Sequence, residues 1–238
     1  MLKDSELKKE IEEAKAKNVS KMISNSTSFQ SNEFNLRIQK SFPEVKAALG
    51  LYPLDALELN DAELEKAFKW FEHKATECIA FGEVGMDFKY AKTDSEKEKQ
   101  EEIFRRFIFL AKKYNKPLIV HSRYAQSQVL KILESEKAEK VLLHSFVDSS
   151  KLIKQAAEHG YFVSIGMVIL ENAEVQARIR ELPLENLLLE TDCPIRFSGE
   201  KAMPKDIMRI AEKVAELKSI PLEKLGKALN TNFKRLFG

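Results

Sequence analysis

Short runs of apolar residues alternate along the chain with longer segments in which apolar residues recur every three or four positions. The short runs are typical of buried strands, and the longer segments are typical of helices with one apolar face. We expect strands at 19–23, 45–51, 78–83, 117–121, 140–144, 161–165 and 187–191. We expect helices at 3–17, 28–41, 61–75, 94–115, 124–136, 148–159, 171–181, 205–218 and 221–236.

This alternation predicts an α/β fold, in which a parallel sheet closes into a TIM-type barrel. A length of 238 residues suits one such domain, so we expect a single barrel domain over residues 1–238. The pattern contains seven strands and begins with a helix, whereas a complete barrel has eight strands and begins with one of them. We therefore expect the first strand to be missing, which would leave two unpaired sheet edges.

Composition narrows the class of protein. Hydrophobic residues make up 44% of the chain and charged residues 32%, as in a soluble globular domain. No apolar run approaches the roughly 20 residues that cross a membrane, and the N-terminus lacks a signal peptide's apolar core, so we expect a cytoplasmic protein. Cys78 and Cys193 lack metal-ligand spacing, and we expect both thiols to be reduced. A net charge of +2 neither requires nor excludes nucleic acid.

Candidate metal ligands stand at the ends of four predicted strands. They are Glu83, His121, His144 and Asp192. In a barrel the carboxyl ends of the strands meet on one face, so these side chains can converge. Imidazole and carboxylate groups suit Zn²⁺ or Mn²⁺, and oxygen-rich sites suit Mg²⁺. A lone histidine more often has a structural role, as we expect for His73 and His159, but four strand-end ligands favour a divalent metal site.

Five segments resemble, in order, sequence boxes of the TatD family of metal-dependent deoxyribonucleases. They are Gly82-Glu83-Val84-Gly85-Met86-Asp87, Val120-His121-Ser122-Arg123 with Ala125, Leu143-His144-Ser145-Phe146, Leu189-Glu190-Thr191-Asp192-Cys193-Pro194, and the C-terminal Asn232-Phe233-Lys234-Arg235-Leu236-Phe237. Each box is weak alone, but five in order are specific. The resemblance implies an amidohydrolase-like TIM barrel that holds one or two divalent ions (Zn²⁺, Mn²⁺ or Mg²⁺) and hydrolyses phosphodiester bonds in DNA.

The resemblance also implies roles for individual residues. Glu83, His121 and His144 would hold one ion, and Glu83 with Asp192 would contribute to a second. The family completes that second site with a His-x-His pair on its first strand, and nothing in this sequence matches the pair. Glu83 and Asp192 are the candidate catalytic residues, with Asp192 as general base or water-orienting group. Arg123 would hold a phosphate of the substrate bidentately.

A departure from the family occurs at Tyr52, where the family usually has a histidine that faces the substrate. We expect Tyr52 to bind substrate, because tyrosine can donate a hydrogen bond or stack on a base. Arg123 could instead pair with Asp87, which we expect to support the metal ligands rather than to be one. Glu190 is expected to have a similar supporting role.

Two other functions stay open at this stage. The first is hydrolysis of an ester, a lactone or an amide, because one barrel scaffold hosts many chemistries. The second is a metal-poor barrel retained for binding, which the unmatched His-x-His pair and Tyr52 both favour. The oligomeric state is not predicted.

Overall fold

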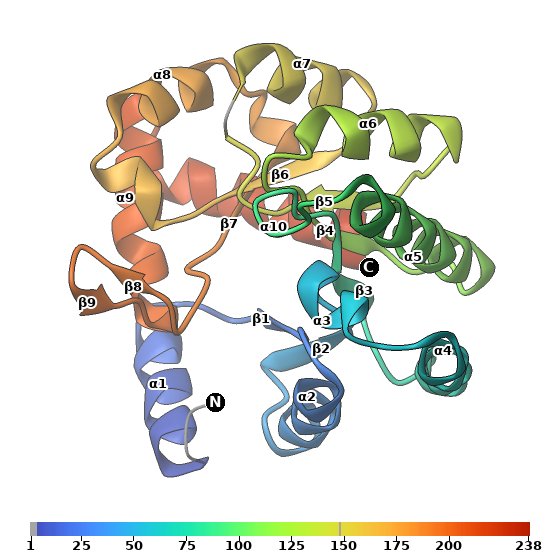
Figure 1. Ribbon diagram of the computed structural model, residues 1–238. Helices are drawn as coiled ribbons and strands as arrows, with labels where there is room; N and C mark the ends of the chain where they lie inside the picture. The colour runs from blue at the N-terminus through green and yellow to red at the C-terminus, as the bar shows by residue number, and fades with distance from the viewer. Residues whose placement is uncertain (1–3, 148) are drawn as a thin grey trace. The chain divides into compact units, whose positions relative to one another are not determined.

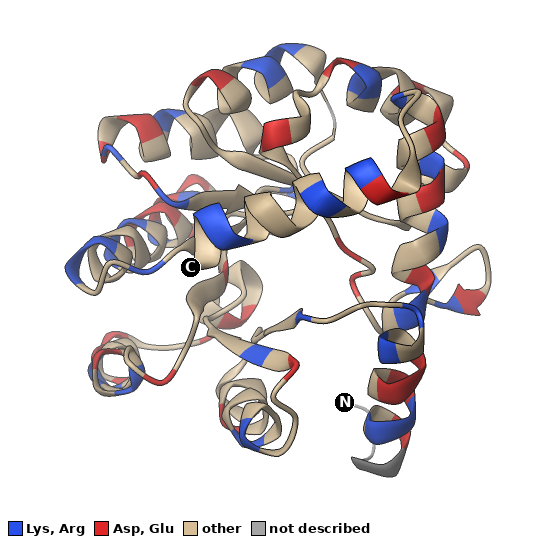
Figure 2. Ribbon diagram, turned by 180° about the vertical axis from the view of Figure 1, so that it is seen from behind, with Lys and Arg blue, Asp and Glu red and all other residues tan. Residues whose placement is uncertain are grey.

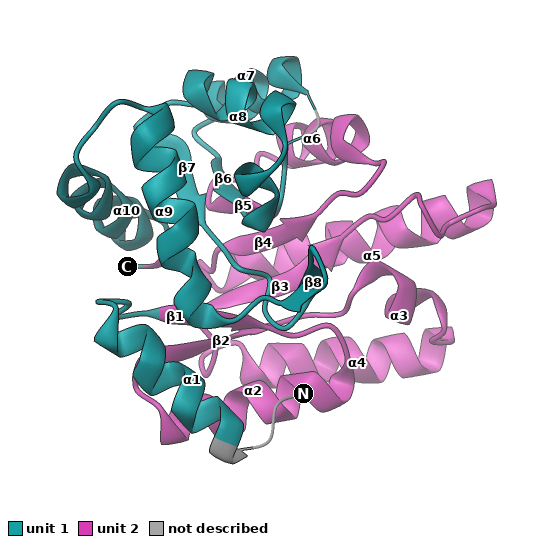
Figure 3. Ribbon diagram, turned by 90° about the vertical axis from the view of Figure 1, so that its left-hand side faces the viewer, with its two compact units in different colours: residues 1–21, 145–236, 238 teal, residues 22–144, 237 magenta. Residues whose placement is uncertain are grey.

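The computed structural model describes residues 4–147 and 149–238. The chain divides into two compact units (Figure 3). Unit 1 comprises residues 1–21, 145–236 and 238, and unit 2 comprises residues 22–144 and 237. The prediction of a single domain over residues 1–238 stays a prediction.

Unit 2 is built on a parallel sheet whose strands are neighbours in both space and sequence (Figure 1). Its strands are β1 (Met22–Asn25), β2 (Val45–Leu49), β3 (Ala80–Gly85), β4 (Leu118–His121) and β5 (Val141–Leu143). The connecting helices are α2 (Phe29–Ser41), α3 (Pro53–Leu57), α4 (Asp61–Lys74), α5 (Asp94–Lys113) and α6 (Gln126–Ser135). Parallel neighbours joined in this way form the repeat of a β/α barrel.

Side-chain caps fix where three of these helices begin. The side chains of Ser28, Asn60 and Thr93 each accept a hydrogen bond from the backbone N–H three residues later, and the side chain of that later residue accepts one from the cap's own N–H. Such a capping box satisfies two N–H groups that a helix start otherwise leaves unpaired. The caps therefore determine the residue at which α2, α4 and α5 each begin.

Aromatic side chains form the core between the helices and the sheet of unit 2. The rings of Phe71 and Phe107 have centroids 5.1 Å apart, and Phe107 packs on Phe81 of β3 at 6.1 Å. All three side chains are fully buried, and burial of one phenylalanine contributes roughly 1.5–3 kcal/mol. This packing anchors β3 at Phe81, which is two residues before Glu83.

Unit 1 contains a parallel pair of strands, β6 (Phe162–Ile165) and β7 (Leu187–Leu189), and a two-stranded antiparallel hairpin. The hairpin strands are β8 (Arg196–Phe197) and β9 (Glu200–Lys201). The helices of unit 1 are α1 (Asp4–Ala16), α7 (Ser150–Glu158), α8 (Ala173–Glu181), α9 (Ile207–Leu217) and α10 (Leu222–Phe237). Unit 1 also contains the 3-10 turns η1 (Met167–Leu170), η2 (Leu184–Asn186) and η3 (Pro204–Asp206). Asn232 of α10 donates to the carbonyls of Leu184 and Leu187, both at 2.8 Å, which ties α10 to the start of β7.

The expected strands and helices are confirmed in order, with ends that shift by a few residues. The strand expected at 19–23 runs instead over Met22–Asn25. Lys3 and Asp148, the first residues of two expected helices, lie outside the described residues. Whether a further strand precedes this sequence stays a prediction.

The surface carries mixed charge. Lysine and arginine are interspersed with aspartate and glutamate along the helices (Figure 2), as the balance of 39 basic and 37 acidic residues leads one to expect. Within the described residues, no helix has both the length and the apolar character needed to span a membrane.

Candidate metal centre

Glu83 is placed by close packing of backbones at the carboxyl end of β3. Its backbone N–H donates to the carbonyl of Ser26, which follows β1, at 2.8 Å. A Cβ on Gly50 would lie 2.6 Å from the Gly82 carbonyl carbon and 2.8 Å from the Glu83 nitrogen. Only glycine at position 50 therefore lets the chain after β2 approach β3 so closely. The Glu83 residue is 8% exposed, so its carboxylate lies in a nearly closed environment.

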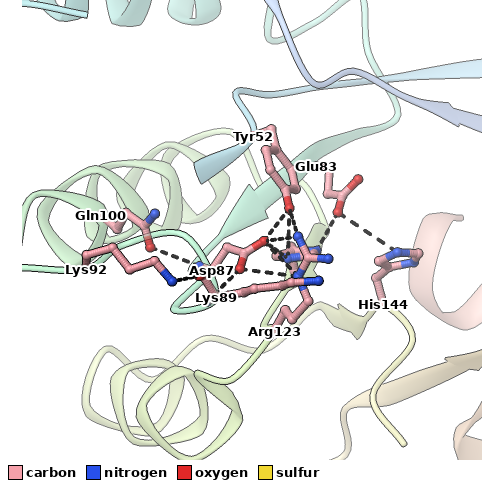
Figure 4. Close-up of polar contacts among 9 residues, drawn as sticks. Tyr52, Glu83, Asp87, Lys89, Lys92, Gln100, Arg123 and His144 are labelled. Carbon is pink, nitrogen blue, oxygen red and sulfur yellow. Dashed lines mark hydrogen bonds and ion pairs between the residues drawn. The ribbon is translucent and has the colours of Figure 1, made fainter. Parts of the chain in front are cut away.

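Two histidines from the next strands face this carboxylate. His121 is the last residue of β4, and its Nδ1 lies 2.8 Å from Glu83 Oε1. His144 follows β5 directly, and its Nε2 lies 3.9 Å from the same oxygen (Figure 4). The backbone N–H of His144 donates to Val120 at 2.9 Å, which aligns the two histidine-bearing segments.

The three side chains have the geometry and the chemistry of a metal site. One ligand atom from each of Glu83, His121 and His144 lies within 4.8 Å of the others. Two imidazoles and one carboxylate form the ligand set of several catalytic zinc sites. The donor set therefore fits a divalent transition metal. The part of the chain that the structure describes contains no second group that meets the same distance limit.

Asp87 lies behind His121 and is fully buried. Its Oδ2 lies 3.1 Å from His121 Nε2 and accepts a hydrogen bond from Arg123 Nη2 at 2.7 Å. The hydroxyl of Tyr52 also donates to Asp87, and the backbone N–H of Asp87 donates to Gln100 Oε1 at 2.9 Å (Figure 4). With Nε2 bonded to Asp87, His121 presents Nδ1 to Glu83. A carboxylate on the far nitrogen is the usual support of a metal-bound histidine.

The pKa values follow from burial and from these hydrogen bonds. Burial raises the pKa of Glu83, but the hydrogen bond from His121 and the charge of His144 outweigh it, so the net pKa is lowered. Burial lowers the pKa of His121, but its bonds to Asp87 and Glu83 leave it raised. Burial opposes ionisation of Asp87, yet His121, Arg123 and Tyr52 hold its pKa well below the usual range. Glu83 and Asp87 are therefore both carboxylates at neutral pH.

Tyr52 is a donor within this network. Burial, followed by the hydrogen bond and charge of Asp87, raises the pKa of Tyr52 well above its usual value. Its ring also contacts the His121 ring edge-on, with centroids 4.9 Å apart. The Tyr52 phenol therefore stays protonated and fixes Asp87 and His121 together.

The structure brings five of the sequence-predicted residues into one network within unit 2. They are Tyr52, Glu83, His121, Arg123 and His144. The pairing of Arg123 with Asp87, foreseen as an alternative, is present: Nε and Nη2 both bond the carboxylate. Asp192 belongs to unit 1, where it follows β7 with a left-handed φ of 53°. Its role stays a prediction.

Two contacts were not predicted from the sequence. The bonds from Tyr52 to Asp87 and from Asp87 to Gln100 join residues that are distant in sequence and lie in no common motif. The only sequence signal for these two contacts was the place of Asp87 in the Gly-Glu-Val-Gly-Met-Asp segment. Glu190, in unit 1, accepts a hydrogen bond from Ser164 on β6.

Known proteins resemble this chain over nearly its whole length. Residues 2–238 match the family described as TatD related DNase. An uncharacterized metal-dependent hydrolase of Bacillus subtilis, YabD, is 32% identical over 98% of this chain and 93% of its own length. The human deoxyribonuclease TATDN3 is 33% identical, over 98% of this chain and 89% of its own.

Solved structures share the fold of this chain. The TatD homologue YJJV of Escherichia coli has a TM-score of 0.88 and 26% identity, over 98% of this chain and 92% of that chain. The Escherichia coli phosphotriesterase homology protein, solved with phosphate in its active site, shares the fold at a TM-score of 0.70 and 13% identity, over 97% of this chain and 88% of that chain. These similarities confirm the predicted barrel class. The chain belongs to the TatD-related DNase family of metal-dependent hydrolases.

Proposed function

We propose that this protein hydrolyses phosphodiester bonds in DNA at the centre formed by Glu83, His121 and His144. The observation that carries the proposal is the convergence of three ligand atoms within 4.8 Å, in a member of a DNase family. A divalent ion bound in such a site acidifies a bound water and polarises a phosphoryl oxygen. Two nitrogen donors beside one carboxylate favour Zn²⁺ or Mn²⁺ over Mg²⁺.

Arg123 is proposed to hold a phosphate of the substrate through Nη1. Its Nε and Nη2 bond Asp87, and Nη2 also bonds Tyr52. Nη1 makes no hydrogen bond within residues 4–147 and 149–238, and the side chain is 38% exposed. Asp87 occupies the Nε–Nη2 edge and Tyr52 takes the other Nη2 hydrogen, so the bidentate phosphate contact expected from the sequence would have to displace one of them. Arg123 therefore offers one end of its guanidinium group to a phosphate oxygen.

Tyr52 is proposed to act as a positioning residue. Its only hydroxyl proton goes to Asp87, and its oxygen accepts from Arg123 at 3.0 Å. The hydroxyl orients Asp87, which in turn orients His121. Direct hydrogen bonding of Tyr52 to substrate would require this network to break.

Asp192 is proposed as the general base, a role that rests on its place in the Leu-Glu-Thr-Asp box after β7. A carboxylate can take a proton from an attacking water when it lies within hydrogen-bond reach. Asp192 with Glu83 would contribute to a second ion site, and whether one or two ions bind stays a prediction. A cytoplasmic location stays a prediction.

Cleavage of labelled DNA tests the proposal. We expect the purified protein to cleave single-stranded or duplex oligonucleotides, to stop after EDTA treatment, and to recover with Zn²⁺ or Mn²⁺. Glu83→Gln and His144→Ala should each lower the rate at least about 100-fold, because a catalytic ion supplies several kcal/mol. His159→Ala is the matched control, since His159 stacks on Tyr161 in unit 1. Hydrolysis of a small carboxyl ester without DNA cleavage would contradict the proposal.

A further inference from the structure

Two loops beside the metal centre run side by side. One follows β3 and the other follows β4. The backbone N–H of Met86 donates to His121 at 3.0 Å, and that of Phe88 donates to Arg123 at 2.9 Å. The loop residues near Arg123 are therefore held close to the candidate ligand His121.

Each loop carries an exposed tyrosine. Tyr90, on the first loop, is 42% exposed, and Tyr124, on the second, is 70% exposed. Tyr124 follows Arg123 directly and has a left-handed backbone, with φ at 57°. A bulky residue in that region costs about 1 kcal/mol or more, and the mostly exposed ring gains little burial to offset the cost. A strained, exposed ring beside a candidate active site is a feature that suggests binding.

Two cationic side chains lie over the Tyr90 ring. The Arg123 guanidinium lies over the Tyr90 ring, 4.8 Å from its centroid, and Lys89 Nζ lies 5.7 Å from the same centroid. Asp87 is the carboxylate that pairs with Arg123, and Lys89 adds a further positive charge beside the ring. Planar rings next to positive charge favour a ligand with both aromatic faces and anionic groups. An unpaired nucleotide has both.

We propose that Tyr90 and Tyr124, the tyrosine rim, stack on unpaired bases of a DNA strand whose phosphate lies at Arg123. This inference rests on the proposed nuclease function and adds how the substrate is held. A base can stack on the tyrosine rim only if it is not already stacked within a duplex. The tyrosine rim therefore binds a single-stranded end or a frayed terminus. Because every base has an aromatic face, recognition here tolerates sequence.

The test compares an oligothymidylate with the same oligonucleotide lacking bases, both with phosphorothioate linkages that resist cleavage. Affinity for the purified protein is measured by fluorescence anisotropy. Tyr124→Asn removes the ring and suits the left-handed backbone, because asparagine adopts that region readily. Tyr124→Phe keeps the ring. Phe109→Ala removes an exposed ring on α5 and serves as the matched control.

We expect Tyr124→Asn to weaken binding of the oligothymidylate about tenfold and to leave binding of the abasic strand unchanged. Tyr124→Phe and Phe109→Ala should bind both strands like the wild type. Equal weakening for both strands, no weakening for either, or no binding of DNA at all would overturn the tyrosine rim.

The two proposals fail separately. Base-dependent binding through Tyr124 without DNA cleavage by the wild type would overturn the nuclease function and keep the stacking site. Cleavage of DNA with no effect of Tyr124→Asn would overturn the stacking site alone.

Discussion

His121 lies between two carboxylates, with Glu83 at Nδ1 and Asp87 at Nε2. Each contact constrains the other, because a neutral imidazole has one protonated nitrogen and one lone pair. If an ion took the place of the Nδ1 hydrogen bond to Glu83, the proton on Nε2 would stay directed to Asp87 and the lone pair of Nδ1 would be free to bind the ion. Asp87 therefore controls the centre although it is not among the three candidate ligands.

Replacement of Asp87 by asparagine should weaken metal binding. The amide retains the shape of the side chain but loses the charge that favours the correct His121 tautomer. We expect the affinity for Zn²⁺ to fall about 10- to 100-fold, measured by competition with a chromogenic chelator. Tyr52→Phe, which removes one bond to Asp87 and keeps the carboxylate, should have a smaller effect. Equal affinity of Asp87→Asn and the wild type would contradict the supporting role.

Among the elements, β3 and β4 determine the geometry of the centre. Their register pairs Gly85 with His121, so the end of one strand sets the position of a ligand on the next. The sequence predicted both strands, since each is a buried apolar run. It did not predict α3, which is too short for a helical period, or the hairpin of β8 and β9, whose strands have two residues each.

Gly85→Ala should destabilise the protein and disturb the site. Gly85 has φ at 133°, and a Cβ there would lie 2.1 Å from the carbonyl oxygen of His121. We expect a loss of more than about 1 kcal/mol in the free energy of unfolding, measured by urea denaturation. Gly160→Ala is the matched control: Gly160 also has a positive φ, at 75°, but a Cβ there has nothing within 4 Å. If Gly85→Ala lowered the free energy of unfolding no more than Gly160→Ala does, the predicted clash with His121 would be contradicted.

The stability that Glu101 of α5 contributes through its hydrogen bond from Gln128 of α6 should depend on pH. Burial raises the pKa of Glu101, but its bonds to Arg105 and Gln128 outweigh it and lower the pKa below 4.5. A lowered pKa adds stability above the unfolded pKa, and this contribution is lost as pH falls through the folded pKa. Glu101→Gln should thus cost under about 1 kcal/mol at pH 7 and less near pH 3. Urea unfolding at both pH values checks this, and an equal cost at both would contradict it.

At the scale of the whole molecule, the ligands were predictable and their support was predictable only in part. Glu83, His121 and His144 could be found because strand-end positions and box order both mark them. The pairing of Arg123 with Asp87 was predicted only as an alternative, and the hydrogen bond from Tyr52 depends on a side-chain direction that no periodicity encodes. Asp192 was predicted by the same reasoning as the other ligands, but it lies in unit 1. Its place in catalysis is therefore a matter for experiment.

Metal content per chain tests the central claim most directly. The protein would be measured by inductively coupled plasma mass spectrometry as purified, after EDTA, and after dialysis against Zn²⁺ or Mn²⁺, beside Glu83→Gln and His159→Ala. The account predicts at least about one ion per chain in the wild type and in His159→Ala, lost with EDTA and regained on dialysis. It predicts much weaker retention in Glu83→Gln. A wild type that binds no ion after reconstitution, or a Glu83→Gln variant that holds it equally well, would contradict the account.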